Sequence, residues 1–272
     1  MRTRSPIKFI LTASVLAVLA SGAGGCSSLI KNEVTGSIGA STAPQTDADW
    51  RKAIEVYGER YRADPKDAEA ALRYGQALRA TGQRAQATAV LEHAAIVNPN
   101  DRALIAAYGR ALVDNGKYQQ GFDTLSRAHT PDNPDWHILS VQGTALDRLG
   151  RHEEARRYYS NALKIKPDEP SVLSNLGMSY VLSKQLAKAE EALRRAQEGA
   201  QSDTRIRQNL ALAVGLQGRM GEAESIIAAG LPPDEAAESV GQLKQMLNRG
   251  SAQKPPAGRA ARTTEAVRDS NS

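Results

Sequence analysis

The sequence has little of what most enzymes and cofactor-binding proteins depend on. Its 272 residues include one cysteine, four histidines, two tryptophans and two phenylalanines. A single cysteine cannot form a disulfide within the protein. The stretch His152-Glu153-Glu154 lacks the second histidine that a metalloprotease helix needs, and no phosphate loop, dinucleotide fingerprint or nucleophile elbow occurs. We therefore predict a protein that is not an enzyme, binds no metal and uses no cofactor.

A basic excess is missing from the body of the chain. The whole sequence has 35 basic and 30 acidic residues. Three of the basic residues lie in 1–25, and 249–272 contains five basic residues and two acids. Subtracting them leaves 27 basic and 28 acidic residues in 27–248. The basic character thus belongs to the two ends, which argues against a nucleic-acid partner.

Long apolar runs are also absent, except for one near the N-terminus. Arg2, Arg4 and Lys8 precede an apolar run at 9–20, and small residues follow it up to Cys26. A positive start, a short apolar core and a small-residue exit are typical of a secretory signal peptide. The run is too short to cross a membrane comfortably as a helix. We predict a signal peptide at 1–25.

The position of Cys26 resembles the lipobox of bacterial lipoproteins, in which the cysteine is acylated and becomes the mature N-terminus. Ser27 after the cysteine then implies an outer-membrane lipoprotein that faces the periplasm. Residues 26–48 are rich in Ser, Thr, Gly and Ala and predict a flexible tether. Lipoproteins usually have leucine where this sequence has Ala23, so ordinary cleavage, which leaves a soluble periplasmic protein, remains the alternative.

A period of 34 residues organises most of the chain. Four ladders recur in one register. The first ladder contains Gly75, Gly109, Gly143, Gly177 and Ala211. The second contains Ala87, Gly121, Ala155, Ala189 and Ala223. The third contains Leu91, Leu125, Tyr159, Leu193 and Ile227, and the fourth contains Ala94, Ala128, Ala162, Ala196 and Gly230. A fixed period of this size predicts a solenoid.

Each unit reads as two amphipathic helices, because apolar residues recur at helical spacing in both halves. The separating glycines are Gly82, Gly116, Gly150 and Gly218. Glycine at this place takes the left-handed conformation that ends a helix. Lys184 stands in the same turn of the fourth unit, at some conformational cost. Pro99 and Pro167 discourage the second helix from continuing into the next unit.

This pattern resembles the tetratricopeptide repeat, which implies an all-α superhelical solenoid of antiparallel helix pairs. The resemblance covers five full units: 68–101, 102–135, 136–169, 170–203 and 204–237. A half unit from residue 49 precedes them, and 234–247 reads as a terminal capping helix, so the predicted array spans 49–247. The polar segment 248–272 is expected to be disordered.

In such a solenoid the first helices line a concave face. The candidate groove residues are Arg73, Arg110, Ser174, Asn175, Met178, Arg205 and Asn209. In peptide-binding members of the family an asparagine at the place of Asn175 and Asn209 holds the ligand backbone, because an amide both donates and accepts hydrogen bonds. The flanking cations that complete a carboxylate clamp are not all present, which disfavours a receptor for the C-terminal carboxylates of other proteins.

The order of leader, tether, short array and polar end resembles the TadD lipoproteins of tight-adherence (Tad/Flp) pilus assembly. That resemblance implies a membrane-tethered scaffold whose partners are proteins or extended peptides of a pilus or secretion machine. We expect no nucleic-acid or small-molecule ligand. A second hypothesis is an accessory lipoprotein that regulates an envelope polymer-export or peptidoglycan enzyme. The sequence of the mature protein does not separate the two.

Overall fold

The computed structural model describes residues 46–252 and their side chains as far as Asn248. The predicted signal peptide, Cys26, nearly all of the tether and most of the polar tail lie outside the described residues. Within the described part the backbone is helical, with a single isolated bridge between Thr130 and Asn133 and no strand.

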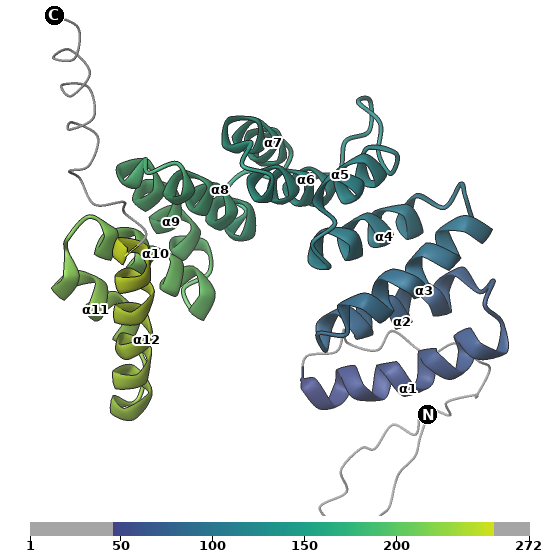
Figure 1. Ribbon diagram of the computed structural model, residues 1–272, viewed down its shortest axis with the longest axis horizontal. Helices are drawn as coiled ribbons and strands as arrows, with labels where there is room; N and C mark the ends of the chain where they lie inside the picture. The colour runs from purple at the N-terminus through teal and green to yellow at the C-terminus, as the bar shows by residue number, and fades with distance from the viewer. Residues whose placement is uncertain (1–45, 253–272) are drawn as a thin grey trace, which may run out of the picture. The chain divides into compact units, whose positions relative to one another are not determined.

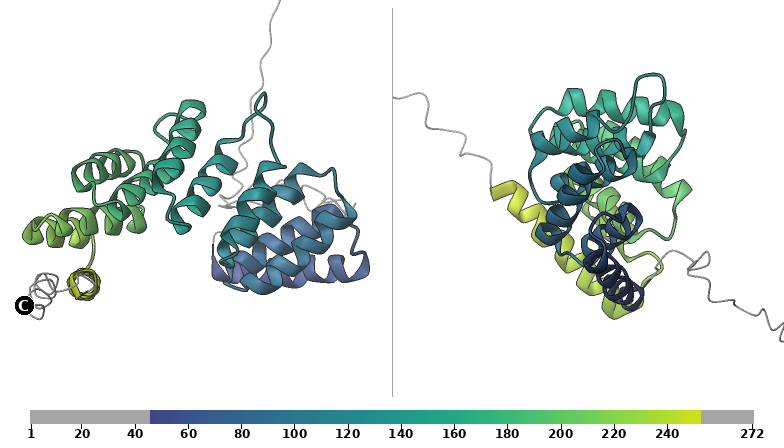
Figure 2. Two further views of the ribbon diagram at one scale, coloured as in Figure 1. Left: turned by 45° about the horizontal axis from the view of Figure 1, so that its top comes forward. Right: turned by 90° about the vertical axis from the view of Figure 1, so that its right-hand side faces the viewer.

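Twelve helices follow one another in the described part of the sequence (Figure 1). They are α1 (Asp47–Ala63), α2 (Ala68–Ala80), α3 (Arg84–Val97), α4 (Arg102–Asp114), α5 (Tyr118–Ser126), α6 (Trp136–Arg148), α7 (His152–Ile165), α8 (Pro170–Leu182), α9 (Leu186–Gly199), α10 (Thr204–Leu216), α11 (Met220–Ala228) and α12 (Pro233–Ala252). Each helix packs against the next one along the sequence, and Figure 2 follows the same succession from two further directions. The predicted arrangement of a half unit, five helix pairs and a terminal helix is therefore confirmed.

The packing glycines explain why the two helices of a unit lie so close together. A Cβ atom added to Gly75 would be 2.5 Å from Cγ of Leu91, and one added to Gly177 would be 2.5 Å from Cγ of Leu193. Both leucines are fully buried. Residues at the first and third ladders are thus in direct contact in the first four units, where a residue without a side chain leaves room for the large one.

Aspartate marks the start of most first helices. The carboxylates of Asp67, Asp101, Asp135 and Asp203 accept hydrogen bonds from backbone amides in the first turns of α2, α4, α6 and α10. These bonds satisfy amides that have no partner within the helix. The fourth unit differs, since Glu169 makes no such bond and Pro170 opens α8. Proline suits the first position of a helix, where its missing amide hydrogen costs nothing.

The turns between paired helices follow the sequence prediction. Glycines at 82, 116, 150 and 218 all have positive φ, and Lys184 has φ 59° in the equivalent turn. The second unit ends differently: its prolines are at 131 and 134, and α5 stops at Ser126, with nine residues between it and the start of α6. At the end of the array, α12 starts at Pro233 and continues to Ala252, which is five residues beyond the predicted boundary at 247.

One position of the second helices contacts the following unit at four successive junctions. Its residues are Thr88, Phe122, Arg156 and Glu190, each 34 residues from the next. Thr88 Oγ1 lies 3.3 Å from the carbonyl oxygen of Ala111. The ring of Phe122 meets the ring of Tyr158 edge to face, with 5.5 Å between the centroids. The first two junctions therefore use a hydroxyl and an aromatic ring.

The later two junctions use charged groups at the same position. Arg156 donates to Ser183 Oγ at 2.9 Å, and its guanidinium lies 5.2 Å from the ring centroid of Tyr180. Glu190 accepts from Arg219 at 2.6 Å. The four junctions thus share a backbone geometry and differ in chemistry.

Candidate functional site

The first helices of the five units form one continuous face. In the described array α2 contacts α4, α4 contacts α6, α6 contacts α8 and α8 contacts α10. Positions separated by 34 residues therefore form rows across neighbouring helices. Arg73, Arg110 and Arg205 are exposed, whereas Asn175, Met178 and Asn209 are half-buried and Ser174 is buried. We call the surface that these rows form the first-helix face.

The two asparagines are held by the preceding unit. Asn175 Nδ2 donates to Ser140 Oγ at 3.2 Å, and Asn209 Nδ2 donates to Ser174 Oγ at 3.0 Å. No described residue donates a hydrogen bond to the Oδ1 atom of either amide. The amides are therefore oriented, and each keeps one carbonyl oxygen that can accept a hydrogen bond from a peptide N–H.

A buried carboxylate joins the third and fourth units. Asp147 accepts hydrogen bonds from His152 Nδ1 at 2.8 Å, from Ser179 Oγ at 2.8 Å and from Tyr159 OH at 3.0 Å. Burial and the charge of Asp147 raise the pKa of Tyr159 far above its usual value, so the phenol remains a neutral donor. The donors come from α7 and α8, so this group ties both helices to α6. We call the four residues the Asp147 node.

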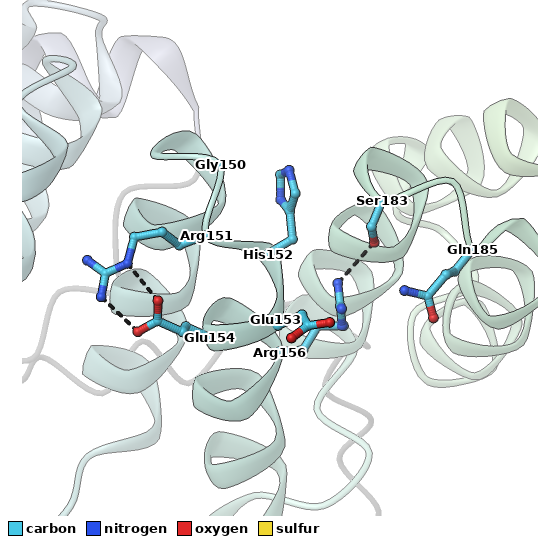
Figure 3. A pocket seen from close by; sticks show the side chains of 8 residues that line it. All are labelled: Gly150, Arg151, His152, Glu153, Glu154, Arg156, Ser183 and Gln185. Atoms are coloured by element: carbon cyan, nitrogen blue, oxygen red, sulfur yellow. Dashed lines mark hydrogen bonds and ion pairs between the residues drawn. The ribbon is translucent and has the colours of Figure 1, made fainter.

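One member of the Asp147 node, His152, also lines a polar cleft of about 470 Å³ (Figure 3). It lies between the α6–α7 turn and the α8–α9 turn, and its lining residues are Gly150, Arg151, His152, Glu153, Glu154, Arg156, Ser183 and Gln185. Arg151 pairs with Glu154 at 2.7 Å, and Arg156 donates to Ser183. Because these cations already have partners, the cleft offers an incoming ligand less than the first-helix face does.

Two family models described as tetratricopeptide repeat match the chain. One matches residues 51–180 and the other matches residues 148–213. The chain is a tetratricopeptide-repeat (TPR) protein. No curated protein matches it significantly.

Solved TPR structures share the fold. The crystal structure of PilW, described as a widely conserved type IV pilus biogenesis factor, aligns with a TM-score of 0.62 at 18% identity, covering 71% of this chain and 91% of PilW. TTC0263, a thermophilic TPR protein of Thermus thermophilus, aligns with a TM-score of 0.57 at 23% identity, covering 68% of this chain and 99% of that protein. At these identities the likeness concerns the fold.

Neither matching model describes an enzyme. Within residues 46–252, no group of three or more His, Cys, Asp or Glu side chains is placed to hold a metal ion. The helices of this part are also too short or too polar to cross a membrane. TPR proteins mediate interactions between proteins, and the continuous first-helix face offers a surface for such an interaction.

The structure places the predicted groove residues unevenly. Ser174 is 7% exposed and serves as the acceptor for Asn209, so it supports the face rather than lining it. Arg205 pairs with the helix cap Asp203 at 3.2 Å. Arg73 and Arg110 make no ion pair with any described residue. Sequence reasoning missed the Asp147 node, although Ser179 stands where four other units have alanine and Tyr159 stands in a ladder of leucine and isoleucine.

An ion-pair network closes the last TPR junction. Glu190 accepts from Gln217 at 2.8 Å and from Arg194 and Arg219 at 2.6 Å each. Burial alone would raise the pKa of Glu190, but the hydrogen bonds from Gln217 and the two arginines outweigh it and lower the pKa below the ordinary value of 4.5.

A Glu190→Gln variant is expected to show what this carboxylate contributes. The folded-state pKa lies below the unfolded-state pKa, so the carboxylate stabilises the fold above the unfolded-state pKa and stops doing so as pH falls through the folded-state pKa. At pH 7 the variant should be about 1–2 kcal/mol less stable than the parent in urea unfolding, and the difference should shrink in acid. The exposed neighbour Glu191, changed to Gln, is the control. A difference that persists unchanged at low pH would contradict this account.

Proposed function

We propose that this TPR protein is a non-enzymatic scaffold that binds segments of envelope proteins along the first-helix face. The observation that carries the proposal is the unbroken contact from α2 through α10, which aligns the rows of five units. The oriented amides of Asn175 and Asn209 support it, since each presents a free carbonyl oxygen on that face.

We further propose that the machine it serves is a Tad/Flp-type pilus, where the scaffold helps the outer-membrane secretin to assemble or localise. Two observations support this choice. The order of leader, tether and array resembles that of the TadD lipoproteins. PilW, which has the same fold over 71% of this chain, is described as a pilus biogenesis factor.

The binding face is tested by a pull-down from native envelope extract, with residues 27–272 as bait and mass spectrometry as the readout. We expect secretin and pilus components with the parent bait and a loss of at least about tenfold with Asn175→Ala/Asn209→Ala, because a lost pair of backbone hydrogen bonds costs a few kcal/mol.

The matched control is Ser140→Ala/Ser174→Ala. It removes the same two hydrogen bonds between units from the other side and leaves both amides in place. Equal recovery by both double variants would mean that the asparagines do not touch the partner. Recovery of polymer-export or peptidoglycan enzymes in place of pilus components would favour the second hypothesis, in which the protein regulates such an enzyme.

We propose that Cys26 carries the lipid and that the protein faces the periplasm from the outer membrane. Cells grown with labelled palmitate should incorporate label into the parent, and Cys26→Ser should abolish incorporation and move the protein to the soluble periplasmic fraction. Two or more acyl chains are needed for firm anchoring. An unlabelled parent in the soluble fraction would establish the soluble alternative.

A further inference from the structure

The first-helix face carries unpaired positive charge at its α2–α4 end. Arg79 pairs with Asp114 across the two helices, with 2.7 Å between Nε and Oδ2. Arg73 on α2 and Arg110 on α4 are exposed and form no ion pair with a described residue. Arg79 and Arg110 thus both interact with the single carboxylate of Asp114, and Arg73 adds a further exposed positive charge on α2.

The surroundings of Arg110 show that this charge is not offset locally. Nearby protein atoms partly desolvate its guanidinium and lower its pKa, the positive charge of Arg79 lowers it further, and Asp114 opposes both effects only in part. The guanidinium groups of Arg79 and Arg110 therefore lie close enough to repel each other. An anion placed there would relieve the repulsion between the two arginines.

The α8–α10 end of the same face has the opposite character. Helix α8 contains no charged residue, and the two charged residues of α10 are Arg205, which pairs with the helix cap Asp203, and the buried Arg207. Leu182 and Leu216 occupy equivalent positions at the ends of these helices and are 53% and 38% exposed. Each continues a stripe at helical spacing, which on α8 is Asn175, Met178 and Leu182 and on α10 is Asn209, Leu212 and Leu216. Exposed leucines beside free amide oxygens suit apolar side chains on an extended backbone.

We propose that the first-helix face binds an extended segment of a partner protein that has acidic residues over α2 and α4 and bulky apolar residues over α8 and α10. This inference rests on the proposed function and gives the chemistry of its partner. Neighbouring helices pack about 8–10 Å apart and an extended peptide advances about 3.3–3.6 Å per residue. Helix α4 is separated from α8 by two such helix-to-helix distances. The acidic and apolar groups of the bound segment should therefore lie about five or six residues apart.

Charge complementarity selects this occupant over a polyanion. A nucleic acid or an anionic membrane presents negative charge along its whole length, and the uncharged α8 offers nothing to it. Residues 27–248 together contain one more acidic residue than basic residues. The positive charge of the arginines on α2 and α4 is therefore a local feature of this face and does not reflect the net charge of the whole body. A segment with one charged end and one apolar end matches both halves of the face.

The test uses the full-length protein and fluorescein-labelled synthetic peptides, read by fluorescence anisotropy. Each peptide carries three acidic residues, a Ser/Thr spacer and two leucines three residues apart, and the spacer has about two, six or twelve residues, chosen from the estimated spacing. The six-residue spacer should bind at least about fivefold more tightly than either other length, and its affinity should fall as salt rises.

Two double variants separate the halves of the face. Arg73→Glu/Arg110→Glu should weaken binding at least about tenfold and remove its salt dependence. Leu182→Ser/Leu216→Ser should weaken it by a similar factor and leave the salt dependence intact. Arg84→Glu and Ile96→Ser are matched controls, because both residues are exposed on the second helix α3 and neither belongs to the rows of the first-helix face, and Ile96 is 70% exposed. Circular dichroism checks that every variant remains folded.

Binding that ignores spacer length, or that survives both double variants, would overturn the inference. So would equally tight, Arg73- and Arg110-dependent binding of single-stranded DNA or of phosphatidylglycerol vesicles, because the occupant would then be a polyanion. If the peptides fail while Asn175→Ala/Asn209→Ala still abolishes capture of envelope proteins, the proposed function stands and only this partner chemistry is wrong.

Discussion

Asp147→Ala is expected to lower the free energy of unfolding by about 3 kcal/mol, which is a large effect for one side chain. The carboxylate is the shared acceptor for His152, Tyr159 and Ser179. Removing it leaves three donors without their partner, and Tyr159 is only 1% exposed, so water cannot easily replace the lost acceptor. Urea unfolding followed by circular dichroism measures the change. Asp114→Ala is the control and should cost less than about 1 kcal/mol, because its ion pair with Arg79 is partly exposed.

The same site allows a rescue that the repeat itself suggests. Val113 and Val181 stand where Asp147 stands, other units have leucine where Tyr159 stands, and alanine is usual at Ser179. Replacing a buried polar group together with its buried partners by fitting apolar residues is often neutral. Asp147→Val/Tyr159→Leu/Ser179→Ala removes the carboxylate and its two buried donors, while His152, whose side chain is 26% exposed, can donate to water instead. The triple variant should therefore recover most of the stability that Asp147→Ala loses. A triple variant as unstable as Asp147→Ala would contradict this account. It would show that the polar network adds net stability to the fold, beyond supplying hydrogen-bond partners to its own buried groups.

Gly177→Ala is expected to cost about 2 kcal/mol, although alanine is the better helix former. The added Cβ would lie 2.5 Å from Cγ and 3.0 Å from Cδ2 of the buried Leu193, so α8 and α9 must separate or the leucine must leave its rotamer. The free energy of unfolding in urea measures the cost.

Gly241→Ala is the matched control for this substitution. Gly241 also lies within a helix, but a Cβ there would meet nothing within 4 Å. That variant should gain about 0.5–1 kcal/mol, because alanine reduces the conformational freedom of the unfolded state and adds no clash to the folded one. If both variants gained stability, close packing at the glycine ladder would not be what fixes the helix pair.

The helix pairs could be predicted from sequence because their causes are local and repeated. Four units have a glycine at one place and the fifth has the small Ala211, and a large apolar residue follows sixteen positions later in every unit. This pair allows one close packing of the two helices, and five copies of the pattern reinforce one another. The turn glycines act through their own backbone conformation, so even the exception at Lys184 was foreseeable.

The hydrogen bonds of the site could not be predicted in the same way. Asp147 and Ser179 are 32 residues apart, and Asn175 and Ser140 are 35 residues apart. Which of several polar side chains on adjacent helices meet depends on the exact rotation of one unit against the next. Ser174 was placed on the groove for the same reason, whereas its position lies at the contact between first helices, where it is buried. The peptide-binding role of Asn175 and Asn209 stays a prediction.

The differing chemistry at the four junctions bears on how the protein avoids misfolding. Units of equal length and nearly equal backbone can in principle stack out of order, with one unit skipped and expelled as a loop. Skipping the unit of α6 and α7 would bring Phe122 against Tyr180 and Ser183 in place of Tyr158, and would leave Arg156 without its acceptor. Different side chains at the equivalent position therefore distinguish the units from one another. Only one order of the units allows all four junctions to form their contacts together.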